Sequence, residues 1–216
     1  ADQRACLEVM LEFGADLSGR QQPFQNTPLY FLAGYMQGSE AAARAHSGMH
    51  WLLEHGADPN VTSGDQADTP LHQVARMGGG LAIAEALLAH GADPNAARTD
   101  GRTPYALAYR RGDMAMCEAM RAHGARPALT PIDEFLGAAL GGDVEGARAR
   151  LAADPNMLEH STHEDHAVLV QLTAEGRLDA VALLVSLGFD LGREGAWGGT
   201  ALHWAAWHGR VAMVEQ

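Results

Sequence analysis

The sequence predicts an all-α protein, a solenoid of stacked helix-turn-helix units joined by short turns or hairpins. One recurring phrase is Gly-Ala-Asp, which begins at Gly56 and Gly91 and each time follows an apolar segment of helical character. A second phrase, Thr-Pro, begins at Thr69 and Thr103. The first phrase recurs after 35 residues and, as Gly124-Ala125, after a further 33. A fixed period of this length is typical of repeat proteins.

Each phrase has a local physical reason to stand where it does. Threonine is a good helix N-cap, and proline at the next position has its φ angle already set for the first helical turn. Glycine after the second helix can adopt the left-handed conformation that ends it. The polar, Gly-containing stretch 96–102 is typical of a turn or hairpin. Neither helix of a unit can bury its apolar face alone, so neighbouring units must stack.

The phrase Thr69-Pro70-Leu71-His72 and the period resemble the ankyrin-repeat family, whose signature is Thr-Pro-Leu-His-x-Ala every 33 residues. The resemblance covers essentially the whole chain and implies an ankyrin-repeat solenoid. We expect a single array over residues 1–216 with about seven repeats, of which the first and last are incomplete. Repeats five and six, residues 127–193, are degenerate.

Three irregularities qualify this pattern. We expect the first helix of repeat five, near 133–140, to lack Thr-Pro at its start, and its second helix to end early, at 152–154. Repeat six has His166-Ala167-Val168-Leu169 where Thr-Pro-Leu-His is expected. Repeat two carries about eight additional residues within 35–47, and this Ala-rich stretch favours an elongated helix or a bulged turn.

The last repeat is of the internal type. Trp204, Val211 and Val214 have spacings that face inward or toward a further repeat. A bare internal repeat exposes apolar surface, so we expect the array to continue past Gln216 or to be covered there by another molecule. The same reasoning predicts further chain upstream of Ala1.

Composition excludes several classes of partner. The chain has 27 acidic residues against 15 arginines and no lysine, which gives a formal charge of −12. This balance does not fit a nucleic-acid binder or an anionic membrane surface, and no apolar run is long enough to span a bilayer. Two cysteines, Cys6 and Cys117, do not make a disulfide framework.

The amino-acid composition also indicates the kind of genome that encodes the protein, and the start of the chain bears on its location in the cell. Arg-, Ala- and Gly-rich usage without lysine indicates a GC-rich, bacterial genome. The sequence favours a cytoplasmic location, with secretion or a periplasmic location left open because the chain begins with Ala1 rather than Met.

No pattern for catalysis or cofactor binding stands out. The chain has no Gly-x-Ser-x-Gly phrase and no phosphate loop. Cys117 stands where a small core residue is expected. His72 and His203 occupy the fourth position of the Thr-Pro-Leu-His phrase, where the resemblance implies a structural role. We therefore expect no enzyme activity, no cofactor and no small-molecule substrate.

One histidine cluster is a candidate metal site. His160, His163 and His166 are spaced three apart, beside Glu164 and Asp165. Such residue types bind zinc, but these fall in the turn before a helix and do not have the His-Glu-x-x-His spacing. We expect solvated turn residues rather than a metal site.

The resemblance implies that a partner protein is held by the turn tips and the exposed ends of the first helices, which together form a concave surface. Arg, Trp, Tyr and Met are enriched at such interfaces. The expected contact residues are Tyr35, Asp65, Gln66, Arg76, Met77, Asp100, Arg102, Arg110, Arg111, Trp197, Trp207 and His208.

The charge of the middle of the chain suggests the kind of partner. Residues 76–126 hold seven arginines and five acidic residues, in an otherwise acidic chain. A positively charged stretch in the middle of the chain would suit an acidic segment of a partner. Arginines that are scattered over the surface and only keep the protein in solution would say nothing about the partner. The alternative of scattered charges stays open.

These observations favour a non-catalytic scaffold for protein–protein interaction. The alternative is an ankyrin module of a larger catalytic or toxin-like chain, truncated at both ends. A metal-responsive module using the histidine cluster is a third reading.

Overall fold

The computed structural model describes residues 3–22, 25–34, 40–78, 80–195 and 198–209, and every regular element in these ranges is a helix. Two isolated antiparallel bridges, Gln21 with Asn26 and Ser63 with Asp68, close the turns before two of the helices. The all-α prediction is confirmed. No helix among the described residues is long and apolar enough to cross a membrane.

The chain forms two compact lobes. The N-terminal lobe holds residues 1–108 and 115–128, and the C-terminal lobe holds residues 109–114 and 129–216. The helix at 104–110 therefore contributes residues to both. The prediction of seven repeats in one array is not tested by this division.

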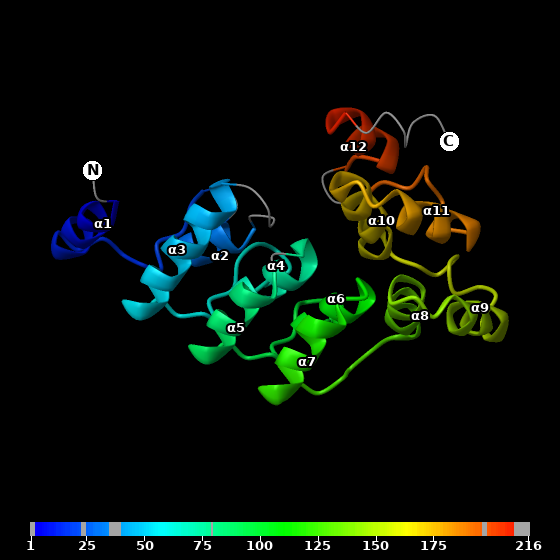
Figure 1. Cartoon of the computed structure of the whole chain (residues 1–216), viewed down its shortest axis with the longest axis horizontal. Helices are drawn as coiled ribbons and strands as arrows, with labels where there is room; N and C mark the ends of the chain where they lie inside the picture. The colour runs from blue at the N-terminus through cyan, green and yellow to red at the C-terminus, as the bar shows by residue number, and fades with distance from the viewer. Residues whose placement is uncertain (1–2, 23–24, 35–39, 79, 196–197, 210–216) are drawn as a thin grey trace. The chain divides into compact units, whose positions relative to one another are not determined.

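Helices of the N-terminal lobe come in stacked pairs, in which a short first helix is followed by a second helix (Figure 1). Helix α2 packs on α3 and on α4, and α4 packs on α5. The helices are α1 Gln3–Glu12, α2 Pro28–Ala33, α3 Glu40–Glu54, α4 Pro70–Met77, α5 Leu81–Ala89, α6 Pro104–Arg110 and α7 Met114–Ala122. At 15 residues α3 is longer than α5 and α7, so the insertion in repeat two is at least partly an elongated helix.

The Thr-Pro phrases start the first helices as predicted. Thr27 and Thr69 are the N-caps of α2 and α4, and a proline follows each one. His72 closes the cap in α4, because its Nδ1 accepts hydrogen bonds from the Thr69 backbone N–H at 3.1 Å and from the Thr69 hydroxyl at 2.8 Å. Its Nε2 donates to the carbonyl oxygen of Arg102 at 3.2 Å, in the next repeat. The structural role expected for His72 is confirmed.

Asparagines join the turns that follow the second helices of successive repeats. Asn95 Nδ2 donates to the Gly124 carbonyl oxygen at 3.0 Å, and Asn95 Oδ1 accepts from the Arg126 backbone N–H at 2.8 Å. Asn60 makes the same two bonds to the backbone of Gly91 and Asp93. The same pair of bonds thus joins one repeat to the next at both places, which accounts for the recurrence of Asp-Pro-Asn at 58–60 and 93–95.

The C-terminal lobe also consists of helix pairs. Helix α8 packs on α9, and α10 packs on α11 and α12 (Figure 1). The helices are α8 Pro131–Leu140, α9 Val144–Ala153, α10 His163–Glu175, α11 Leu178–Ser186 and α12 Ala201–Trp207. The early end expected for the second helix of repeat five, at 152–154, is confirmed.

Two predictions for the C-terminal lobe were wrong. Repeat five does have Thr-Pro at the start of its first helix, because α8 begins two residues earlier than expected, with Thr130 as N-cap and Pro131 as first residue. Helix α10 likewise begins at His163, after the cap Thr162, and not near His166. The side chains of Asp133 and Asp165, three residues after each cap, accept hydrogen bonds from the cap threonines. An acceptor three residues after the cap supports a helix start in the same way as in a capping box.

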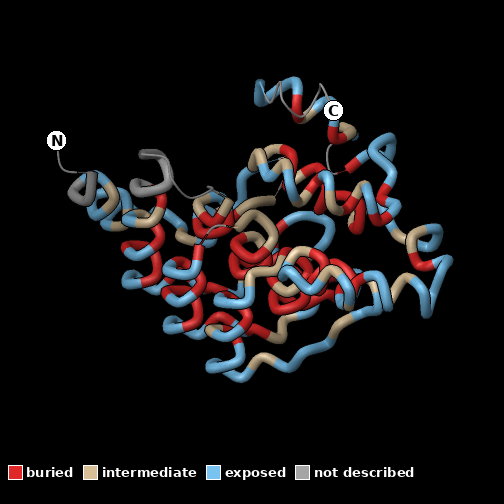
Figure 2. Tube along the Cα trace, turned by 45° about the vertical axis from the view of Figure 1, so that its right-hand side comes forward, coloured by how far each residue is buried: buried red, intermediate tan, exposed pale blue. Residues whose placement is uncertain are grey.

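The core of the C-terminal lobe is built from α8, α10 and α11 with the chain after α11. Leu136, Leu172 and Leu184 are fully buried there, and the rings of Phe135 and Phe189 stack at 6.0 Å between centroids. Figure 2 shows that buried residues follow the helices, whereas the connecting turns are largely exposed. Many side chains in the turns are therefore available to a partner, as are exposed side chains on the helices.

Candidate partner-binding surface

The turn tips of the N-terminal lobe are exposed and are bonded to one another. Asp65 and Gln66 lie at one tip and Thr99 lies at the next, all of them exposed. The Thr99 hydroxyl donates to Gln66 Oε1 at 2.6 Å, and the Thr99 backbone N–H donates to the Gln66 carbonyl oxygen at 3.1 Å. Because the two tips are linked, they present a pre-organised edge.

Asp100 is exposed at the second tip but is engaged by two arginines. Its carboxylate accepts from the Arg102 backbone N–H at 3.1 Å and pairs with Arg102 Nη1 at 2.9 Å and with Arg98 Nη2 at 3.3 Å. Burial raises the pKa of Asp100, but the Arg102 backbone N–H and the two guanidinium charges outweigh it, so the pKa lies below its usual value. Asp100 is thus an ionised acid whose charge is largely neutralised.

Arg76 is half-buried between first helices rather than extended into solvent. Its Nη2 pairs with Asp68 at 3.4 Å, and it donates to the Tyr30 hydroxyl and to Gln73. Burial, together with the charge of Asp68, raises the pKa of Tyr30 to about 12. Met77, the next residue, is also half-buried.

Three of the arginines expected on the surface are buried, which corrects the prediction of an exposed positive stretch. Only 8% of Arg102, 2% of Arg110 and 7% of Arg111 is exposed. Arg102 is held by Asp100. The other two lie in the C-terminal lobe and are held by acidic residues of later repeats.

Arg110 bridges two capping aspartates. Its Nη2 lies 2.7 Å from Asp165 Oδ1, and its Nε lies 3.6 Å from Asp133 Oδ1. Both aspartate side chains are almost completely buried. Charges removed from water in this way need partners with good geometry, so Arg110 and the two helix caps form one structural unit.

Arg111 is engaged near the C-terminal end of α10. Its Nη2 lies 2.7 Å from Glu175 Oε1, and Nη1 donates to Gln171 Oε1 at 3.4 Å. Neither Arg110 nor Arg111 therefore presents a positive charge to solvent. The acids that neutralise them lie outside residues 76–126, which is why the charge of that stretch alone was misleading.

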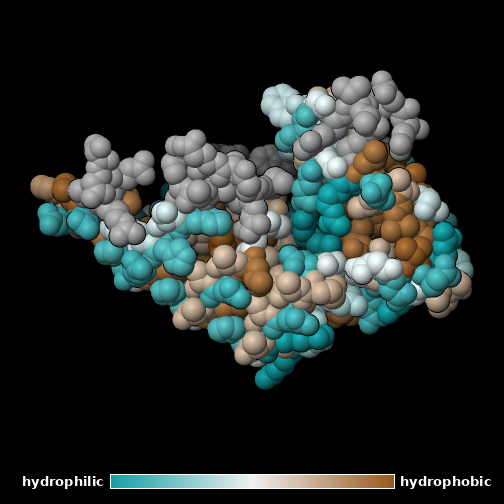
Figure 3. Space-filling view, viewed as in Figure 1, coloured by the Kyte–Doolittle hydropathy of each residue, from teal (hydrophilic) through white to brown (hydrophobic). Residues whose placement is uncertain are grey.

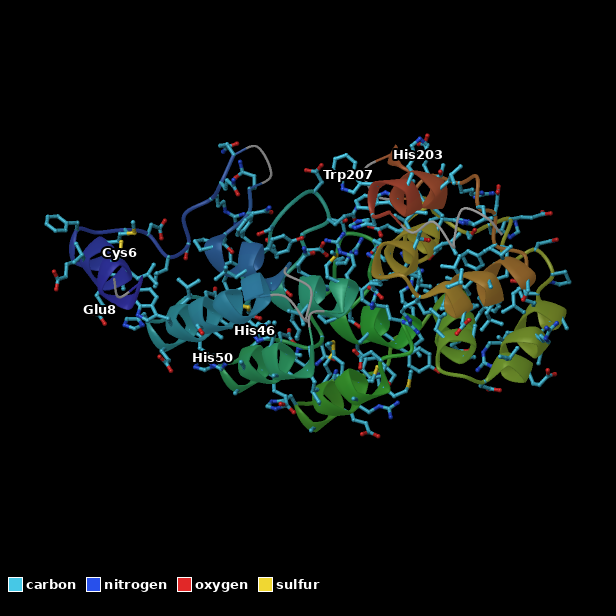
Figure 4. All side chains as sticks on the ribbon, turned by 45° about the horizontal axis from the view of Figure 1, so that its top comes forward. Cys6, Glu8, His46, His50, His203 and Trp207 are labelled. Carbon is cyan, nitrogen blue, oxygen red and sulfur yellow. The ribbon has the colours of Figure 1, made fainter. Side chains whose placement is uncertain are left out.

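Aromatic side chains are exposed in both lobes. Trp207 of α12 is 84% exposed and extends from the helix (Figure 4), and His208 after it is exposed. His203, Trp204 and Trp207 line an apolar pocket of about 250 Å³. Tyr35 and Trp197 lie outside the described residues.

Sequence reasoning missed Phe31, which lies on the first helix α2 and is 49% exposed. Its neighbour Leu32 is directed toward α3, since a Cβ atom added at Gly48 would lie 3.1 Å from Leu32 Cδ1. A large apolar side chain at the end of the Thr-Pro-Leu-Tyr-Phe stretch, directly after Tyr30, which stands where His72 stands in the next repeat, was the available signal. The expected contact residues were taken from the turn tips and the ends of the first helices, so Phe31 was not among them.

The histidine cluster is not one site. His160 and His163 are exposed, whereas His166 is buried in α10, with Nε2 2.7 Å from the Ser161 hydroxyl and its ring 5.1 Å from the Phe189 ring. Burial lowers the pKa of His166, and the nearby charge of Arg193 lowers it further. Among the described residues, no three His, Cys, Asp or Glu side chains are grouped as metal ligands would be.

Comparison with known families agrees with this architecture. Two models described as ankyrin repeats (many copies) match the chain, one over residues 52–108 and the other over residues 166–215. No curated protein matches the chain. The matched segments and the stacked helix pairs support an ankyrin-repeat protein, and the fold is an all-α ankyrin solenoid. Ankyrin repeats are generally modules for protein–protein interaction and are typically non-catalytic.

Proposed function

We propose that this protein is a non-catalytic scaffold that binds a partner protein through a surface on the N-terminal lobe, here called the tip-and-helix face. It consists of the linked tips, with Asp65, Gln66 and Asp100, and the outer side of the first helices, with Phe31 and Met77. The observation that carries the proposal is the pair of exposed turn tips linked by the bonds between Thr99 and Gln66, in the same lobe whose first helix α2 carries the half-exposed Phe31. Burying an aromatic side chain is the commonest source of hot-spot energy at interfaces.

The linked tips favour binding for a second reason. Side chains already held by hydrogen bonds lose little conformational freedom when a partner binds. Gln66 is held in this way by Thr99. In the C-terminal lobe, the exposed Trp207 and His208 support a second contact area, which we propose on exposure alone.

Site-specific photo-crosslinking in cells of the source organism tests the proposal. A photoreactive phenylalanine analogue at Gln66 or Phe31 should give covalent adducts with one partner protein, identified by mass spectrometry. The matched control is Glu85, which is exposed on the second helix α5 and lies outside the tip-and-helix face. Equal adducts at all three positions, or adducts at Glu85 alone, would show that the face is wrongly assigned.

A further inference from the structure

A small cavity in the N-terminal lobe lies between the second helices of two successive repeats. Its volume is about 20 Å³, and its walls come from α3 and α5. The lining residues are His46, Met49, His50, Ala82, Ile83 and Ala86. None of them belongs to the tip-and-helix face. A cavity of this size holds one water molecule or one small ion, and it is too small for an organic ligand.

Two histidines of α3 border this cavity (Figure 4). His46 and His50 are four residues apart, so they lie on the same side of the helix, one turn from each other. No other two of the eleven histidines in the chain have this spacing. His50 is exposed, which leaves the pair accessible from solvent.

The inner histidine has a ring nitrogen without a partner. His46 Nε2 is buried and has no hydrogen-bond partner within the described part of the chain. Apart from the histidines, the cavity wall is formed by the apolar side chains of methionine, alanine and isoleucine. A buried polar atom normally has a partner, and here the partner must be His50 or a species inside the cavity.

Imidazole nitrogens are good ligands for Cu²⁺, Ni²⁺ and Zn²⁺. Two histidines four residues apart on one helix can bind the same ion, as they do in the His-Glu-x-x-His pattern of zinc enzymes. The spacing of His46 and His50 is the same, although the glutamate of that pattern is absent. The pair thus has the geometry of a metal chelate without the catalytic base.

The charge of the lobe also favours a cation. The N-terminal lobe has eight arginines and thirteen acidic residues, a formal charge of −5. Figure 3 shows hydrophobic and hydrophilic residues interleaved on the visible side of this lobe, without the continuous apolar patch that would favour a covering partner. We therefore expect the two histidines to meet solvent and its ions.

We propose that His46 and His50 bind one divalent transition-metal ion, Cu²⁺, Ni²⁺ or Zn²⁺, with water in the remaining coordination positions. No three His, Cys, Asp or Glu side chains in the described ranges are grouped as metal ligands, so this is a two-histidine chelate and differs from a closed four-ligand structural site. Because both ligands belong to α3, the ion binds the folded helix and stabilises it.

The test is isothermal titration calorimetry of the whole chain with Ni²⁺ as the chloride salt, in a buffer that does not bind metals. We expect one ion per chain, and a melting temperature that rises as the Ni²⁺ concentration is raised. His50→Gln should weaken binding at least about tenfold, because one of the two protein ligands is lost. This position is exposed, so the fold should be retained. His46→Gln should have the same effect on binding.

Two control variants remove other ligands that Ni²⁺ could use. His160→Gln with His163→Gln removes the exposed histidines of the C-terminal lobe, and Cys6→Ser removes the exposed thiol. Both controls lie elsewhere in the sequence and should leave the affinity within about twofold. Circular dichroism of every variant checks that its helices are unchanged.

Electron paramagnetic resonance of the wild-type chain with one equivalent of Cu²⁺ gives a readout that needs no variant. Its spectrum should show coupling of the copper to two imidazole nitrogens. A spectrum without nitrogen coupling, no stoichiometric binding of Ni²⁺, or binding that survives both His46→Gln and His50→Gln would overturn the proposal. In each of these cases, a water molecule is the partner of His46 Nε2.

Discussion

Replacing Arg110 should destabilise the C-terminal lobe far more than replacing any exposed arginine. Arg110→Met keeps the length and apolar stem of the side chain but leaves the carboxylates of Asp133 and Asp165 buried without their cation. Removing one partner of a buried ion pair typically costs about 3–5 kcal/mol. For a chain of 216 residues that unfolds as one unit, about 1 kcal/mol corresponds to roughly 2–4 °C, so the melting temperature of the chain should fall by roughly 6–20 °C.

The assay is urea unfolding followed by circular dichroism, with hydrogen exchange to locate the loss. Exchange should speed up at the amides of α8 and α10, because the helix caps and the ion pairs share the two aspartates. Arg148→Met is the matched control, since Arg148 forms only an exposed pair with Glu145 at 3.9 Å and its loss should change stability by less than about 0.5 kcal/mol.

A rescue variant separates the ion pair from simple packing. Asn at positions 133 and 165 still has an oxygen that accepts the cap hydrogen bonds but carries no charge. The triple variant Arg110→Met, Asp133→Asn, Asp165→Asn should therefore be clearly more stable than Arg110→Met alone. If Arg110→Met lies within 1 kcal/mol of the wild type, or if the triple variant restores nothing, the reasoning about this buried cluster is refuted.

Three further predictions concern the repeat framework. Burial lowers the pKa of His72 below its ordinary 6.5, so as the pH falls the unfolded chain takes up the proton before the folded one. The free energy of unfolding, measured by urea titration, should therefore be constant above about pH 6.5 and decrease below it. A free energy of unfolding of the wild-type protein that does not change with pH would contradict this. Asn95→Ala removes both bonds to the next repeat, one of them to Gly124, and should cost about 1–2 kcal/mol by denaturant midpoint; no change would mean that water replaces the bonds. Gly112→Ala should cost more than about 2 kcal/mol, because φ is +73° and a Cβ would lie 2.6 Å from the backbone at the end of α8. Gly91→Ala, at φ +88° in open space, should cost only about 1 kcal/mol, and equal losses would show that the close approach is unimportant.

The local phrases could be predicted from the sequence because their physics is local. Thr69 and His72 are three residues apart and satisfy each other, so the phrase alone specifies the helix start. The same logic would have found α8 and α10, since Asp133 follows Thr130 by three residues just as His72 follows Thr69. The error was to expect these first helices to start near Asp133 and His166, although they begin at Pro131 and His163 and, at 10 and 13 residues, are longer than α2, α4 and α6.

The burial of Arg110 could not be predicted from local charge. Its two partners lie 23 and 55 residues away in sequence and become neighbours only when the repeats stack. A partial signal was present, because an aspartate at a buried capping position requires a donor or a cation. Phe31 was overlooked for a different reason: the fraction of a helix residue left exposed depends on the neighbouring helices, which the repeat phrase does not describe.

The two kinds of joint between repeats have different consequences for how the chain can change in length. Asn60 and Asn95 each bond only to the backbone of the following repeat, and such a joint works between any two repeats that carry the phrase. A whole repeat could be duplicated or deleted there with both joints re-formed. Arg110, in contrast, depends on acids from the next repeat and from the one after it. Inserting a repeat between α9 and α10 would separate Asp165 from Arg110, so recombination and engineering should tolerate changes of repeat number among the early repeats and reject them after α6.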